Sequence, residues 1–123
     1  MTYAEFQARW ERGAEAEFDA YMRRSGAELV ADAQAGRHGE YYQLWRAMAA
    51  RATLAQAGRV LLDVVRRGST YLVRYHSAVA LLALIGTTEF DPVDLTAGRP
   101  GEATRLDTLE RLLHERLNFD NAV

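Results

Sequence analysis

Three histidines are the side chains best suited to acid–base or metal chemistry near neutral pH. His114 follows Glu110 by four residues, so both lie on one face of a helix and together offer two metal ligands. Two ligands are too few for a metal site, and we interpret them as partners on a solvated helix face. His76 lies in an apolar stretch, which favours a packing role over that of an acid or base. His38, between two glycines, is expected in a surface loop, with contact to a ligand as the alternative.

The composition excludes several reaction classes. The 123-residue chain has no cysteine, and all 15 of its basic residues are arginine. Without cysteine there is no thiolate nucleophile, disulfide or cysteine-bound metal, and without lysine there is no Schiff base or P-loop lysine. The GxSxG and GxGxxG patterns are also absent. The more economical expectation is a protein that is not an enzyme, with no catalytic residue, no metal and no cofactor.

Basic residues concentrate in the middle of the chain. The net charge is −3 over residues 1–36, +5 over residues 37–76 and −4 over residues 77–123. Either the acidic ends fold back to neutralise the middle, or a basic face stays free for an acidic ligand. Four candidate binding residues surround one predicted turn, and they are Arg66, Arg67, Tyr71 and Arg74. His76, in the helix that follows the turn, is a further candidate. Arginine and tyrosine are enriched at protein interfaces and also stack with bases.

Helical periodicity covers most of the chain and predicts a single all-α domain over residues 1–123. Capping boxes begin three of the helices, with Ser or Thr followed three residues later by Glu or Gln. No strand pattern appears. The predicted helices span 3–24, a short stretch from the cap at 25 to Gly36, 40–51, 54–67, 71–86 and 102–117.

The first predicted helix has an aromatic stripe. Tyr3, Phe6, Trp10, Ala14, Phe18 and Tyr21 fall on one side, and we expect this side to face the core. Gly13 at its edge predicts a kink or a close contact. The carboxylates of this helix are spread around it, which favours a solvated surface over a paired acid–base site; they are Glu5, Glu11, Glu15, Glu17 and Asp19.

The stretch from Tyr71 to Gly86, YLVRYHSAVALLALIG, is apolar on every side, which predicts a helix at the centre of the fold that other helices surround and bury on every side. Only a short turn separates it from the helix before it, so the two should pack as an antiparallel hairpin. The irregular segment 87–101 holds both prolines, and we expect it to contain one helical turn after Pro92.

Part of this stretch, VRYHSAVALLALIG, resembles the second helix of HEAT-type repeats, and the resemblance extends over residues 54–86 with the preceding helix included. It implies about six helices stacked as antiparallel hairpins, either as a right-handed HEAT-like stack or as a compact orthogonal bundle. It also implies a non-catalytic scaffold that binds other proteins, and it assigns no individual site residue.

These features predict a protein–protein interaction domain whose partner is another protein. In size and acidity it is similar to bacterial immunity proteins that neutralise a toxin. One alternative is a small-ligand protein or enzyme with a pocket near Trp45, Tyr71 and His76. Another is nucleic-acid binding through the basic middle, which the overall acidity disfavours. The chain lacks a secretory signal pattern and a membrane-spanning apolar run, so we expect no membrane partner and a cytoplasmic location; the oligomeric state stays open.

Overall fold

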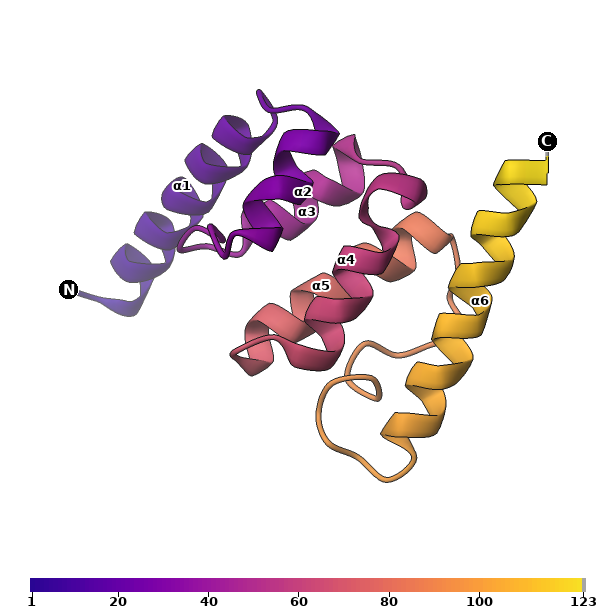
Figure 1. Cartoon of the computed structure of the whole chain (residues 1–123). Helices are drawn as coiled ribbons and strands as arrows, with labels where there is room; N and C mark the ends of the chain where they lie inside the picture. The colour runs from indigo at the N-terminus through magenta and orange to yellow at the C-terminus, as the bar shows by residue number, and fades with distance from the viewer. Residues whose placement is uncertain (123) are drawn as a thin grey trace.

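The structure is a computed structural model that describes residues 1–122, with side chains up to residue 119. Within this part the chain forms six helices and no strand, so the predicted all-α class is confirmed (Figure 1). The helices are α1 (Tyr3–Tyr21), α2 (Gly26–Gln34), α3 (Gln43–Arg51), α4 (Leu54–Arg67), α5 (Tyr71–Ile85) and α6 (Glu102–Ala122).

The helices pack in two rows. In one row α1 contacts α3 and α3 contacts α5, while in the other α2 contacts α4 and α4 contacts α6. The pairs α2–α3 and α4–α5 join the rows, and the α4–α5 contact is the most extensive. As a result α1 and α6 lie at opposite ends of the molecule (Figure 1).

Local capping explains where most helices begin and end. All three predicted capping boxes are present, so the first turns of α1, α2 and α4 have partners for their free N–H groups. The hydroxyl of Thr70 accepts from the Val73 N–H and begins α5. Gly86 adopts φ 79°, a left-handed conformation that glycine tolerates, and ends it.

The start of α3 differs from the prediction. The sequence predicts a helix from Glu40, but the chain runs as a loop until Tyr42, which has φ 60°, and the helix begins at Gln43. Glu17 of α1 supplies the cap, because its carboxylate accepts N–H groups of Glu40 and Tyr41 at 3.0 Å and of Gln43 at 3.2 Å. The acid that complements the α3 dipole therefore comes from another helix.

Two other helix ends also differ. α1 ends at Tyr21 instead of residue 24, since tight turns follow and Ser25 begins α2. α6 continues to Ala122, beyond the predicted end at Leu117. No helix in the described residues is both long enough and apolar enough to cross a membrane.

The core lies around the α4–α5 hairpin and α3. Trp45 and Leu44 of α3, Leu61 of α4 and Leu81 of α5 are almost completely buried. The predicted turn after Pro92 is present, and it brings Leu95 into this core at 1 % exposure. The segment 87–101 thus connects α5 to α6 across the end of the hairpin.

The prediction that α5 is buried on every side is wrong. Leu72 is 44 % exposed and Val79 is 42 % exposed, while other parts of the helix surface contact α3 and α4. These two rows of contacts cover only part of the helix surface. The apolar residues on the remaining side of α5 therefore face outward.

The aromatic stripe of α1 is also less buried than predicted. No residue of α1 is buried, and Tyr3, Phe6 and Trp10 are 78, 53 and 42 % exposed. α3 is the main neighbour of α1, and Gly13 and Glu17 of α1 contact the residues that lead into α3. Gly13 permits a close contact there, because a Cβ atom at this position would overlap the Tyr41 ring.

Replacing Glu17 by alanine should remove the cap of α3. Three backbone N–H groups would lose a charged acceptor, and we expect the free energy of unfolding to fall by about 1–3 kcal/mol in urea denaturation. Glu15→Ala is the control, since the Glu15 side chain has no hydrogen-bond partner within the described residues, and it should change stability by less than about 0.5 kcal/mol. Equal losses in both variants would contradict the capping role.

Candidate functional site

The structure distributes the predicted cluster of binding residues over three surfaces. Arg66 and Arg67 line a pocket of about 200 Å³ between α4 and α6. Arg66 also lines a second pocket of about 320 Å³ with Tyr71, Arg74 and the segment 95–98. His76 lies apart from both, between α3 and α5. Arg66, Tyr71 and Arg74 therefore share one pocket, whereas Arg67 and His76 line two others.

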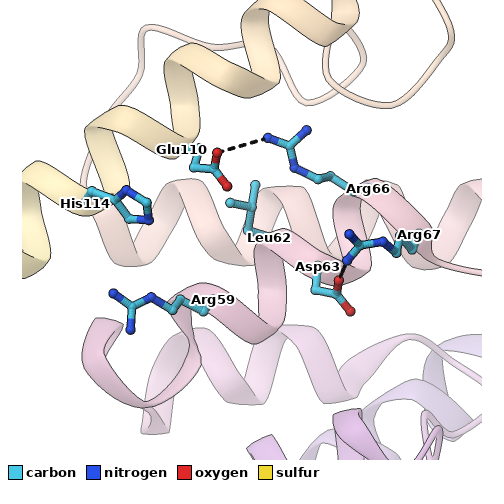
Figure 2. A pocket seen from close by; sticks show the side chains of 7 residues that line it. All are labelled: Arg59, Leu62, Asp63, Arg66, Arg67, Glu110 and His114. Atoms are coloured by element: carbon cyan, nitrogen blue, oxygen red, sulfur yellow. Dashed lines mark hydrogen bonds and ion pairs between the residues drawn. The ribbon is translucent and has the colours of Figure 1, made fainter.

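In the pocket between α4 and α6, carboxylates pair with Arg66 and Arg67, whereas Arg59 forms no ion pair within the described residues (Figure 2). Arg66 lies 3.4 Å from Asp107 and 3.6 Å from Glu110, both on α6. Arg67 forms an ion pair with Asp63 of its own helix. For Arg66, the acidic end of the chain does fold back onto the basic middle. His114 and Glu110 line this pocket, and no cluster of three metal-ligating side chains occurs within the described residues.

Arg74 contributes to the hairpin turn. Its guanidinium donates to the Gly68 carbonyl at 3.1 Å, one of the carbonyl groups that the end of α4 leaves without a helical partner. Tyr71 beside it is 40 % exposed, and its ring centroid lies 6.1 Å from that of Tyr75. These contacts connect α4 to α5 at the turn, so Arg74 has a clear structural role.

A groove between α3 and α5, here the α3–α5 groove, has a volume of about 290 Å³ and includes Trp45 and His76, as predicted, but not Tyr71. The His76 ring stacks on Tyr42 with centroids 5.0 Å apart and planes 16° from parallel. Burial lowers the pKa of His76 below its usual value. The indole Nε1 of Trp45 is buried without an acceptor in the described part of the chain. The other residues that line the α3–α5 groove are Gln43, Arg46, Ala49, Val79, Ala80 and Ala83.

A second groove, the α1–α3 groove, lies between α1 and α3 and has a volume of about 570 Å³. Trp10, Ala14 and Phe18 form an apolar row along α1, and Gln43 and Arg46 line the α3 side. The Arg46 guanidinium lies 3.9 Å from the centroid of the Phe18 ring, which is a cation–π contact.

The two grooves adjoin because Gln43 and Arg46 line both. Exposed Phe6 continues the apolar row of α1, and exposed Leu72 continues the apolar side of α5. We call this surface the α1–α3–α5 face. It comprises the α1–α3 groove, the α3–α5 groove, and Tyr3, Phe6, Leu72 and Val79.

An acidic row borders the α1–α3 groove. Glu11, Glu15 and Asp19 all line it at intervals of four residues, one turn apart. This row differs from the predicted even spread of acids around α1, and the spacing of four residues is the signal in the sequence that indicates it. Like charges at this spacing cost a helix about 0.2–0.5 kcal/mol per pair. None of these three carboxylates forms an ion pair with any residue whose side chain the structure describes. By contrast, Arg24 and Arg37 both pair with the buried Asp32 of α2.

Arg74→Ala should cost more stability than Arg67→Ala. Removing the Arg74 side chain leaves the Gly68 carbonyl without its donor, and we expect the free energy of unfolding to fall by about 1 kcal/mol. The Arg67–Asp63 pair is exposed, so its loss should change stability by less than about 0.5 kcal/mol. Urea denaturation of both variants measures the difference. A larger loss for Arg67→Ala would contradict this assignment.

His76 should make stability fall in mild acid. The pKa of His76 is lower in the folded protein than the ordinary value of about 6.5. Between these two pH values the unfolded chain binds more protons at this residue than the folded chain does. A fall in pH through this range therefore favours unfolding. His76→Phe keeps an aromatic ring against Tyr42 and cannot be protonated. Urea denaturation at about pH 7.5 and about pH 5 should show a smaller loss for the variant than for the wild type. The same loss in both proteins would refute the role of His76.

Comparison with known proteins gives no relative from which a function can be carried over. No family model matches the chain, and neither the curated proteins nor the solved structures include a match. The candidate site is therefore assigned from its own geometry, and the α1–α3–α5 face is the surface where apolar side chains, grooves and charge coincide.

Proposed function

We propose that this protein is a non-catalytic interaction module that binds another protein through the α1–α3–α5 face. The supporting observation is the exposure of Tyr3, Phe6 and Trp10 on one side of α1. Large apolar side chains gathered on one surface are typical of protein-binding sites.

α6 provides an internal comparison for α1. Both helices lie at an end of the stack, and both have a one-sided apolar stripe. Leu106, Leu109, Leu113 and Leu117 of α6 are all at most 8 % exposed. α1 has no buried residue. A helix at the end of this stack can bury its stripe, so the exposed stripe of α1 favours a partner outside the chain.

The alternative functions have weaker support. In the α3–α5 groove, the Nε1 atom of Trp45 is itself buried, out of reach of a small ligand, and the lining residue Val79 is an exposed apolar side chain. For nucleic-acid binding, Arg66 and Arg67 already have carboxylate partners. Both arrangements favour protein binding over these alternatives.

The proposal extends to the type of helix stacking, the kind of partner and the location of the protein. The HEAT-like stacking predicted from residues 54–86 is compatible with two rows of helices. Neutralisation of a bacterial toxin is one specific form of protein binding for a chain of net charge −2 and this size. A cytoplasmic location agrees with the absence of cysteine. A toxin gene next to the gene for this protein would support a toxin as the partner.

Photo-crosslinking in the source cells tests the interface. A photoreactive amino acid at Phe6 or Leu72 should capture one partner protein, whereas the same group at exposed Thr104 or Arg116 of α6 should not. With the purified partner, Phe6→Ser combined with Leu72→Ser should raise the dissociation constant at least about tenfold, because exposed apolar anchors dominate binding energy. Capture from α6 but not from the face would refute the proposal.

A further inference from the structure

The α1–α3 groove has two parallel rows of side chains along α1. The apolar row contains Trp10, Ala14 and Phe18, and the acidic row one position further along the chain contains Glu11, Glu15 and Asp19. At 1.5 Å per residue the apolar row extends over about 12 Å, or two helical turns. An elongated groove with an apolar floor and one charged edge selects for a ligand with the complementary pattern.

The main-chain structure around the groove determines the kind of segment that fits. Both walls are α-helices, whose main-chain groups are already hydrogen-bonded within each helix, and the described residues contain no strand edge. An extended peptide would find no main-chain partners here, so it would have to leave its own polar groups unpaired against Trp10 and Phe18. A helix satisfies its own main chain and brings apolar side chains at intervals of three and four residues. The groove therefore fits a helix.

The acidic row determines the charge of that helix. Glu11, Glu15 and Asp19 are exposed and repel one another along α1, and no described cation pairs with them. Arg46 is the cation within the groove, and its guanidinium lies over Phe18 and donates to Gln43 at 3.4 Å. Arginine or lysine side chains one turn apart on an incoming helix would relieve this repulsion.

We propose that the α1–α3 groove binds a cationic amphipathic helix of the partner protein, an inference that rests on the function proposed above. The apolar side of that helix packs on Trp10 and Phe18. Its cations lie opposite Glu11, Glu15 and Asp19. A second copy of this chain would bring the same acidic row to the interface, which makes it a poorer electrostatic match.

A pair of synthetic peptides tests the chemistry directly. The first is an amphipathic helix of about 18 residues, roughly 27 Å long, with leucines on one side and arginines one turn apart beside them. The second has glutamates in place of the arginines. Calorimetric titration at low salt should detect the arginine peptide and not the glutamate peptide, and added salt should weaken the binding.

Variants of the protein locate the binding site. The triple change Glu11→Gln, Glu15→Gln and Asp19→Asn should weaken arginine-peptide binding at least about tenfold, because it removes all three rim charges. A matched control variant makes the same change in net charge at three exposed acids outside the groove, and its binding of the arginine peptide should be unchanged. The control changes are Glu40→Gln, Glu89→Gln and Glu115→Gln.

Each other outcome overturns the inference. These outcomes are equal binding of both peptides, no binding of either peptide, and an equal effect of the two triple variants. Sedimentation that shows a dimer of the wild type, lost in Trp10→Ser, would make a second copy the occupant instead. If a partner captured at Phe6 bound the acidic-row variant with undiminished affinity, the cationic helix would be refuted while the interaction function would stand.

Discussion

A two-row helical stack has a fixed geometric constraint, because a helix at the end of a row has a neighbour on one side only. α4 and α5 form the most extensive contact and carry much of the core. α1 and α6, at the two ends, must match their apolar side to the few neighbours available. α6 does so with four buried leucines, and α1 does not. The exposed stripe of α1 is informative because α6, in the corresponding place at the other end, buries its own.

Features determined by residues three or four positions apart could be predicted from the sequence. The three predicted capping boxes each depend on two residues three positions apart, and each is present. The beginning of α3 could not be found this way. Its cap is Glu17, more than 20 residues earlier, and no local pattern connects the two.

Burial and pairing were less predictable because they depend on which helices become neighbours. A stripe such as that of α1 indicates which side is apolar but not whether another helix covers it. The same limit applies to Arg66, whose partners Asp107 and Glu110 lie some 40 residues away in α6. The acids of α6 thus partly offset charge inside the molecule, whereas those along the outer edge of α1 do not. Both ends of the chain have a net negative charge in the sequence. Only in the fold does it become visible that acids of α6 pair with Arg66, whereas the acids along the outer edge of α1 stay unpaired within the described residues.

The cap of α3 by Glu17 has a mechanical consequence for α1. Three hydrogen bonds and the contact of Tyr41 with Gly13 fasten the second half of α1 to the start of α3. Trp10, whose ring centroid lies 4.7 Å from that of Tyr41, adds a further contact. The part of the helix before Trp10 continues the same helix and has no hydrogen bond to another element within the described residues. Its direction is therefore set before any encounter, and a molecule that docks along it need not bear the entropic cost of ordering a flexible arm.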